Sequence, residues 1–180
     1  MSSFAMDPDP SAVSLRPFGL SDADDFLSFA GDDQVTRFGR WETLTSIEEA
    51  LAAIRDVCIP HPWRRAVCVG DRCVGFVSAW PGSGDDRCRA DFGYGLARDW
   101  WGKGVATRAV RMALPQVFVD FPDVLRIQAF VGVDNKASQR VLEKAGFTRD
   151  GLLRNYAYLK GTLQDLYLYN FLSTDVVPAD

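Results

Sequence analysis

A glycine-rich turn is the segment of this sequence best suited to chemistry. The turn, Trp100-Trp101-Gly102-Lys103-Gly104, joins an apolar run to the long amphipathic stretch Val105–Phe118, whose apolar residues have helical spacing. The first amides of a helix have no partner within the helix, and the helix dipole adds partial positive charge there. Glycines let an anion approach these amides closely, so the pattern predicts a phosphate or pyrophosphate site. A turn with no ligand is the alternative.

Two better-known phosphate motifs are absent. The pattern G-x-x-x-x-G-K-[ST] is not met, because Gly102-Lys103-Gly104 has neither its spacing nor a hydroxyl residue after the lysine. The pattern G-x-G-x-x-G fails at its third glycine, where this chain has Thr107. The sequence therefore predicts neither a P-loop nor a Rossmann nucleotide site.

Two segments together resemble one family. Gly104 and Ala106 match the acyl-CoA signature [Q/R]-x-x-G-x-[G/A] of the GCN5-related N-acetyltransferases (GNAT), with Trp101 in place of Gln or Arg. That tryptophan is similar to the RimJ/RimL-like branch, the ribosomal-protein N-terminal acetyltransferases. Further on, the segment from Asn135 to Phe147 resembles that branch's N-x-x-S-x-x-V-L-x-x-x-G-F element. Gly151, Arg154, Gly161 and Asp165 follow in the order of its C-terminal block, so the resemblance covers roughly residues 13–172.

The resemblance implies an α/β (α+β) fold of one GNAT-like domain. Its sheet is mixed, mostly antiparallel, flanked by helices and splayed at the acyl-CoA cleft. Acetyl-CoA is the implied co-substrate, with no metal; the pyrophosphate lies on the turn and the pantetheine pairs with the splayed strand. The implied contacts are Leu96, Ala97, Arg98, Trp101, Gly102, Lys103, Gly104, Val105, Ala106, Thr107, Asn135 and Ser138. Gly93 and Gly95 suit a bulge in that strand, which turns its amides toward the thioester.

The periodicity and turn signals predict one domain over residues 13–175, after a disordered tail at 1–12. Expected strands are Val13–Phe18, Ala66–Val69, Cys73–Trp80, Ala90–Leu96, Leu125–Val131, Phe147–Leu153 and Asp165–Leu172. Ser21 is the expected N-cap of a first helix ending near Gly31. Thr45-Ser46-Ile47-Glu48 fits a capping box that opens a second helix reaching Cys58. Pro115 is expected to kink or shorten the Val105–Phe118 helix, and Lys136–Ala145 is the last helix.

The catalytic candidates are Ser138, Asp91 and Glu42. Many family members protonate the leaving thiolate with a tyrosine seven residues after the asparagine, but that position is Leu142 here, and the branch resemblance suggests Ser138 instead. A neutral amine is the nucleophile, so a base or a water relay is needed. Asp91 and Glu42 are the candidates for this role, and an exposed strand residue and a solvated loop residue are the respective alternatives. A loop histidine, His61, is expected to be a bystander.

Aromatic residues gather where an acceptor would enter. Trp41, Tyr94, Tyr156 and Tyr158 are the predicted substrate-binding residues, with Trp63 and Trp80 as further members of the cluster. For any one of them, a place in the hydrophobic core is the alternative. The net charge of −4 suits a cationic amine.

Composition restricts the class of protein. The chain has 180 residues, of which 47% are apolar, which excludes a disordered or collagen-like protein. No apolar run approaches the roughly 18 residues of a membrane-spanning helix, and an acidic chain is poorly suited to nucleic acid. The four cysteines fit reduced thiols and a cytoplasmic protein rather than a disulfide framework.

The sequence therefore predicts an acetyl-CoA-dependent N-acetyltransferase. The expected acceptor is a primary amine, the N-terminus of a protein or peptide, which attacks the thioester directly in a ternary complex. A small amine, such as a polyamine or antibiotic, and a non-catalytic acyl-CoA-binding module remain alternatives. The protein is expected to act as a monomer or homodimer.

Overall fold

One mixed sheet organises the described part of the chain. The computed structural model describes residue 9 and residues 12–179, so the predicted tail at 1–12 lies almost wholly outside the described residues. Seven strands of the described chain form the sheet in the order β1-β2-β3-β4-β5-β7-β6. They are β1 (Val13–Arg16), β2 (Arg64–Val69), β3 (Arg72–Pro81), β4 (Arg89–Leu96), β5 (Arg126–Gly132), β6 (Thr148–Leu159) and β7 (Thr162–Leu172). All neighbours are antiparallel except β4 and β5, which run parallel.

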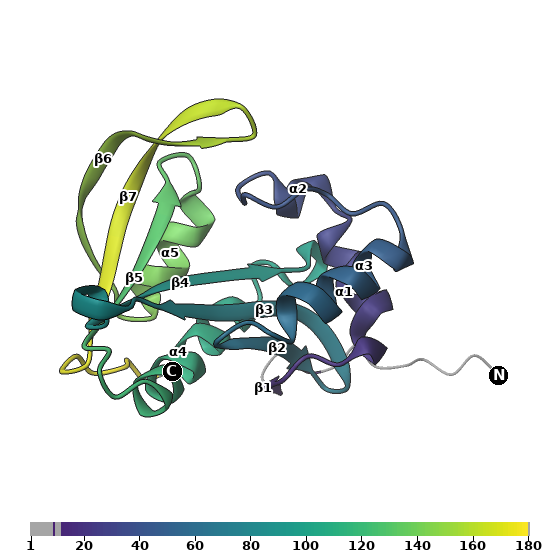
Figure 1. The fold of residues 1–180 in the computed structure, drawn as a ribbon, viewed down its shortest axis with the longest axis horizontal. Helices are drawn as coiled ribbons and strands as arrows, with labels where there is room; N and C mark the ends of the chain where they lie inside the picture. Colours follow the sequence, from purple (N-terminus) through teal and green to yellow (C-terminus); the bar gives the residue numbers. More distant parts are fainter. Residues whose placement is uncertain (1–8, 10–11, 180) are drawn as a thin grey trace.

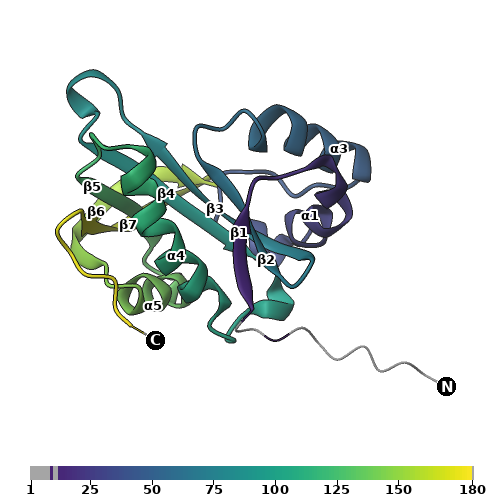
Figure 2. The same cartoon turned by 90° about the horizontal axis from the view of Figure 1, so that it is seen from below.

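Helices cover both faces of the sheet. They are α1 (Ala23–Ala30), α2 (Asp33–Thr36), α3 (Ile47–Ala53), which continues as a π-helical turn to Cys58, α4 (Val105–Asp120) and α5 (Lys136–Lys144). α1 and α3 lie over one face of β1–β3, and α4 and α5 lie on the opposite face (Figures 1 and 2). Alternate strand residues therefore enter two separate apolar cores, and the predicted α/β fold with a mostly antiparallel sheet is confirmed.

The two halves of the sheet are joined over a short length only. β4 pairs with β5 from Arg89 to Asp91, opposite Arg126 to Gln128, and the two strands then diverge (Figure 1). On its other edge, β4 stays paired with β3 up to Leu96. The β4 edge that faces β5 is thus open beyond Asp91, and this opening is called the split below.

Three local predictions needed correction. Ser46, not Thr45, is the N-cap of α3, and its hydroxyl accepts from the amide of Glu49. Asp22, not Ser21, precedes α1 as its N-cap. α4 is not shortened at Pro115 but continues to Asp120. At α3 the next residue along the chain carries the same hydroxyl, whereas at α1 the Asp22 side chain makes no capping hydrogen bond to the helix, so local pattern alone does not fix the cap position.

The glycines of β4 have a different role from the expected bulge. The β3–β4 register is continuous from Gly75–Leu96 to Pro81–Ala90, without a shift at Gly93 or Gly95. A Cβ on Gly95 would lie 2.7 Å from the ring of Phe76. Gly95 is therefore needed because the Phe76 side chain packs directly on the strand backbone.

A buried ion pair fixes the chain between β1 and α1. Asp22 is 5% exposed and accepts two hydrogen bonds from Arg16, at 2.7 and 2.8 Å, and one from the amide of Gly19 at 2.9 Å. Burial by itself would raise the pKa of Asp22, but the hydrogen bonds from Arg16 and Gly19 outweigh it and hold the pKa below its usual value.

We expect Asp22→Asn to lower the free energy of unfolding by about 2 kcal/mol at pH 7, because charge-assisted hydrogen bonds are lost. A carboxylate with a depressed folded-state pKa stabilises the fold above its unfolded pKa, near 4, and loses that effect as the pH falls through the folded value. The difference in unfolding free energy between variant and wild type should therefore become smaller in acid. Urea unfolding from pH 7 to pH 3 measures it, with Asp24→Asn on the exposed side of the same helix as the control. A gap that does not change with pH would contradict this assignment.

Candidate active site

The glycine turn lies at the open end of the split and presents free amides. Gly102 and Gly104 have φ values of +72° and +79°, in the left-handed region that favours glycine. α4 begins at Val105, and its first backbone hydrogen bond runs from Arg108 to the carbonyl of Gly104, at 3.0 Å. Gly104 has no side chain to cap the helix, so the amides before Arg108 face outward. A Cβ at either glycine would meet nothing within 4 Å, which leaves room for an anion.

Trp101 fixes this turn to β4. Its indole Nε1 donates to the carbonyl of Leu96 at 2.8 Å, across the five residues that include the short helical turn Arg98–Trp100. Lys103 places its ammonium 5.0 Å from the ring centre of Trp100. The tryptophan that replaces Gln or Arg in the signature thus sets the distance between the turn and the open strand edge.

The open edge of β4 offers a second set of backbone groups. The amide of Ala97 donates to Val74 in β3 at 2.7 Å, so it points away from the split. Backbone groups alternate along a strand, and the carbonyl of Leu96 already faces Trp101 on the other side. By the same alternation, the amides of Phe92, Tyr94 and Leu96 point into the split. Sequence reasoning named Leu96, Ala97 and Arg98 and missed Phe92 and Tyr94. Arg98 is engaged with Asp32 at 3.1 Å.

Ser138 on α5 is joined to β4 across the split. The Asn135 side chain caps α5 by accepting from the amide of Ser138 at 3.2 Å. The Ser138 hydroxyl lies 2.6 Å from the phenol oxygen of Tyr94, which is also 3.1 Å from the Ser138 carbonyl. Burial raises the pKa of Tyr94, so the phenol keeps its proton as a donor. Leu142, where a tyrosine acid would stand, is fully buried in the core.

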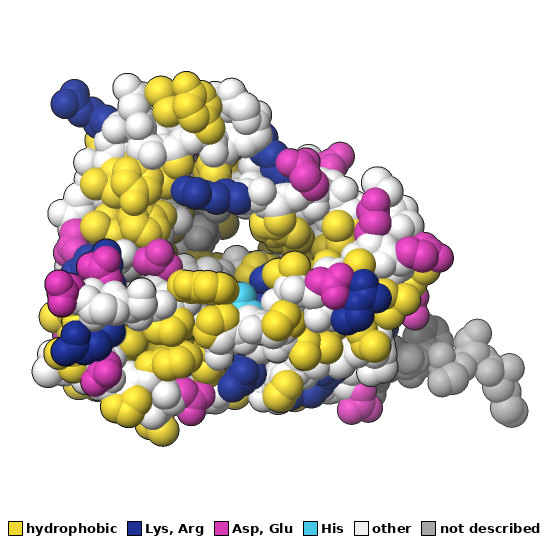
Figure 3. Space-filling view, viewed as in Figure 1, with side chains coloured by type: hydrophobic (Ala, Val, Ile, Leu, Met, Phe, Trp, Pro, Cys, Tyr) yellow, Lys and Arg dark blue, Asp and Glu magenta, His cyan; other side chains and the backbone are white. Residues whose placement is uncertain are grey.

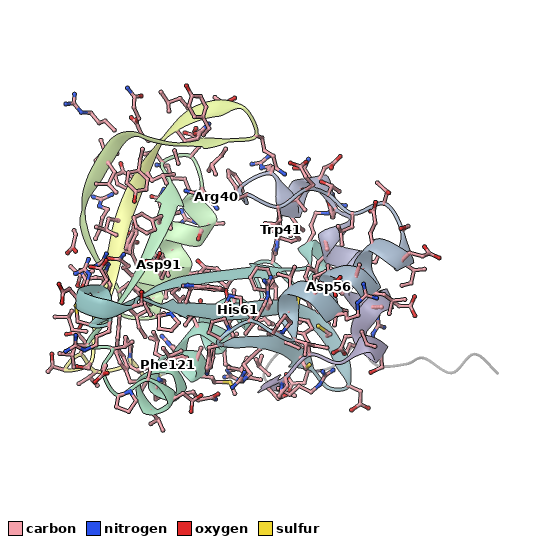
Figure 4. All side chains as sticks on the ribbon, in the orientation of Figure 1. Arg40, Trp41, Asp56, His61, Asp91 and Phe121 are labelled. Atoms are coloured by element: carbon pink, nitrogen blue, oxygen red, sulfur yellow. The ribbon has the colours of Figure 1, made fainter. Side chains whose placement is uncertain are left out.

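Asp91 lies on the opposite face of β4. Tyr94 packs against the α4 and α5 core, whereas odd-numbered residues of the strand face the other way. Asp91 is the last β4 residue paired with β5, and its Oδ1 accepts from the side chain of Gln128 at 2.8 Å. Figure 4 shows it where the two strands begin to diverge. The acid and base candidates Ser138 and Asp91 thus flank the split from its two sides.

The face that carries Asp91 is hollowed. Figure 3 shows a central depression, called the hollow below, between the β6–β7 hairpin and the segment 37–44, with β3 and β4 beneath it. Lys160, at the hairpin tip, donates to the carbonyl of Trp41 and lies 3.6 Å from Glu42. Glu42 has an 89% exposed side chain at this rim, and Asp91 is also an exposed residue, as its alternative assignment expected.

The predicted substrate-binding aromatics divide between three places. Trp41 packs edge-on against Phe76 beside the hollow, with ring centres 5.9 Å apart. Tyr156 stacks on Phe130 of β5 at 5.2 Å, and Tyr158 is 71% exposed on the same strand, β6. Tyr94 points instead toward α5.

Of the two further aromatics, one lies in the core. Trp63 is 1% exposed, and its Nε1 donates to Asp120 at the end of α4, so for Trp63 the core position is the one that holds. Trp80 is 57% exposed and packs edge-on against His61, with ring centres 4.9 Å apart.

His61 lies in a loop, as expected, and this loop places it at the base of the hollow (Figures 3 and 4). Its Nδ1 accepts from the amide of Trp63 at 3.1 Å, so in the neutral ring the proton is on Nε2. Burial, together with the positive charge of Arg64, holds the pKa of His61 below its usual value. His61 is therefore a hydrogen-bond donor to the hollow rather than a base. No sequence signal distinguishes it, because its position depends on Trp80 in another strand.

Comparison with known proteins identifies the fold and the chemistry. The acetyltransferase (GNAT) domain family matches residues 13–148. The chain belongs to the GNAT family. An uncharacterized N-acetyltransferase of Bacillus licheniformis, p20, is 29% identical over 169 residues, which cover 91% of this chain and 94% of the relative. This GNAT protein is accordingly an acyltransferase that uses acetyl-CoA.

Two solved structures share the GNAT architecture of this protein. RimJ of Mycobacterium smegmatis, in complex with CoA-disulfide, has a TM-score of 0.76 and 25% identity over 89% of this chain and 82% of its own. The spermidine N-acetyltransferase of Vibrio cholerae, in complex with CoA and spermine, has a TM-score of 0.75 and 20% identity over 91% of this chain and 97% of its own. The resemblance to the RimJ/RimL branch is confirmed. Because both neighbours have the same fold, the fold does not decide the acceptor.

The described residues contain neither a candidate metal site nor a candidate membrane-spanning helix. No group of three or more His, Cys, Asp or Glu side chains is arranged to hold a metal ion in residues 12–179. In the same part of the chain, none of the helices has the length and apolar character to cross a membrane.

We expect Gly104→Val to weaken acetyl-CoA binding about tenfold or more, measured by calorimetry, because a β-branched side chain fills the space before the amides and disfavours the left-handed backbone. Gly84→Val is the matched control. Gly84 also has a left-handed φ, +58°, with open space around it, but lies in another turn. The two variants should lose similar stability in urea, and only Gly104→Val should lose affinity. Wild-type affinity in Gly104→Val would contradict the placement of the phosphates.

Proposed function

We propose that this GNAT protein transfers the acetyl group of acetyl-CoA to the N-terminal amine of a peptide or protein, by direct attack in a ternary complex. The observation that carries the proposal is the 2.6 Å contact between Ser138 and Tyr94 across the split, with Asp91 on the other face of β4. A catalyst needs a proton donor on the thiol side and an acceptor on the amine side, and this arrangement supplies both.

In this proposal, backbone amides hold acetyl-CoA, the acetyl donor. The amides of the turn from Gly102 to Thr107 take the pyrophosphate, and the amides of the open β4 edge take the pantetheine as an added strand. Acetyl-CoA supplies an acyl thioester. An amide directed into the split, from Phe92 or Tyr94, stabilises the negative charge that develops on the thioester oxygen.

Ser138 is the proposed acid for the departing thiolate. The Ser138 hydroxyl can pass its proton to sulfur as the C–S bond breaks, and the serine oxygen is reprotonated from solvent. The Tyr94 phenol keeps its own proton and donates a hydrogen bond to the serine oxygen. This arrangement requires Tyr94 to donate to the Ser138 hydroxyl rather than to the carbonyl, and both oxygens lie within reach. Burial keeps the phenol protonated at neutral pH.

Asp91 is the preferred base of the two candidates. It lies at the closed end of the split and is oriented by Gln128, whereas Glu42 lies on the exposed rim opposite Lys160. A carboxylate held at the point where the strands diverge can accept a proton from the bound ammonium, directly or through one water molecule, and so leave the neutral amine that attacks.

The similarity to RimJ, at 25% identity, supports a protein N-terminus as the acceptor. The likeness to the spermidine enzyme, at 20% identity, is a likeness of fold. The proposal is tested by incubating the protein with acetyl-CoA and separate sets of peptides, polyamines and aminoglycosides, with CoA release and product mass as readouts. Transfer to peptides is expected, and transfer confined to small amines would overturn the protein N-terminus as acceptor.

We expect Ser138→Ala to reduce kcat about a hundredfold or more while leaving the acetyl-CoA dissociation constant within a few-fold of wild type. Tyr94→Phe should reduce kcat by a smaller factor, because the serine keeps its own proton. Ser83→Ala, an exposed serine whose side chain caps nothing in its own turn, is the control. Steady-state kinetics and calorimetry measure the two effects. Full turnover in Ser138→Ala would remove this residue from the mechanism, and a protein that binds acetyl-CoA but transfers to no amine would be a binding module.

A further inference from the structure

Arg64 is a half-buried cation without an anion beside it. It opens β2 on the α1 and α3 face of the sheet, and its guanidinium carbon lies 4.1 Å from the ring centre of Phe76. Its Nε is buried without a hydrogen-bond partner, and no carboxylate of the described residues forms an ion pair with it. Arg65, the next residue, faces the other way and lies 3.7 Å from Asp120.

A cation in this setting destabilises the folded protein unless an anion or a hydrogen-bond acceptor lies beside it. Burial lowers the pKa of Arg64, yet a guanidinium stays charged at neutral pH. The ring of Phe76 attracts the charge but offers no lone pairs for five N–H donors. A buried charge without an acceptor is destabilising, so this position favours a ligand that brings an anion.

The position of Arg64 relates it to the split. In the sheet register, Arg64 is opposite Ser78 of β3, and Ser78 is opposite Gly93 of β4, just beyond the last residue paired with β5. Arg64 is thus two strand spacings, about 10 Å, from the place where amine and thioester meet, on the face that carries Asp91.

Two other side chains around the hollow, like Arg64, can donate hydrogen bonds to an anion. His61 is close enough for the Arg64 charge to depress its pKa, and its Nε2–H is free to donate. Arg40 is exposed, has no ion pair with any described residue, and projects from the segment 37–44 toward the β6–β7 hairpin (Figure 4). Of the carboxylates around the hollow, Glu42 is paired with Lys160, whereas Asp91 is bonded to the neutral amide of Gln128 and lies two residues along β4 from Gly93, the residue in register with Ser78 and Arg64. The inner part of the hollow is therefore a site for a negative group, despite the net charge of −4 of the whole chain.

We propose that Arg64 binds a carboxylate or phosphate on the acceptor, so that the substrate is an amine with an acidic group a short distance from it. The inference rests on the proposed acetyl transfer and narrows its acceptor class. For a peptide acceptor, the acidic group is the side chain of one of the first residues. For a small molecule, it is a carboxylate or phosphate on the same skeleton as the amine. A polyamine is disfavoured, because its second ammonium would be placed beside Arg64.

The test compares peptides that differ only in charge, with the unmodified protein. Peptides with Asp at position 1, 2 or 3 are compared with their Asn counterparts, and free glutamate and phosphoethanolamine with spermidine. At one of the three positions, we expect Asp to raise kcat/KM about ten- to a hundredfold over Asn, the effect of one charge-assisted hydrogen bond. Activity on glutamate or phosphoethanolamine but not on any peptide would support the anion site and identify a small molecule as its source.

Arg64→Gln should remove the preference for Asp by lowering kcat/KM for the acidic peptide and leaving that for the Asn peptide nearly unchanged. Arg64→Lys should restore part of the preference, because it restores the charge without the bidentate geometry. Arg65→Gln is the matched control on the opposite face, and this variant should keep the preference for the Asp peptide. The wild-type comparison of peptides stands even if Arg64→Gln folds poorly.

The failures are distinguishable. Transfer to peptides with no difference between Asp and Asn at any position would overturn the anion site and leave the proposed function intact. Preferred transfer to spermidine would overturn the anion site as well. Binding of acetyl-CoA without transfer to any amine would overturn the proposed function and this inference with it.

Discussion

The separation of β4 from β5 is the constraint on which the rest of the structure depends. Three residue pairs hold the strands together, and beyond Asp91 the backbone groups on one edge of β4 have no strand beside them. Exposed backbone groups at a sheet edge pair with any extended chain that fits. The turn that begins α4 lies at one end of this edge and the Ser138–Tyr94 contact crosses it, so the proposed acyl-CoA site and the proposed proton donor share one opening.

Strand alternation then divides the chemistry between two faces. Tyr94 and Asp91 are on the same strand but three residues apart, so their side chains point to opposite sides of the sheet. One side reaches α5 and the proposed proton donor, and the other reaches the hollow, the proposed entrance for the amine. The acid and the base do not compete for space, because the strand itself lies between them.

Local charge differs from the charge of the whole molecule. The net charge of −4 suggested a cationic acceptor, yet the inner hollow holds Arg64 and a neutral His61 that donates. Net charge is a sum over mostly exposed residues that solvent and salt screen, whereas a few buried groups determine the potential in a depression. The proposed acceptor class therefore rests on an arginine that lacks a carboxylate neighbour, and only a folded chain reveals that.

The sequence by itself determined the features that depend on neighbouring residues. The turn with Gly102 and Gly104, the helix after it, the helix that begins at Lys136 and the order of the elements all follow from patterns a few residues long. The tertiary structure alone decided the contacts between distant segments: Ser138 with Tyr94, 44 residues apart, Gly95 with the ring of Phe76, and His61 with Trp80. It also moved Trp63 into the core and brought Arg64 to the hollow. Such contacts depend on strand register and on the split, and no local pattern encodes how two strands far apart in the chain come to lie side by side.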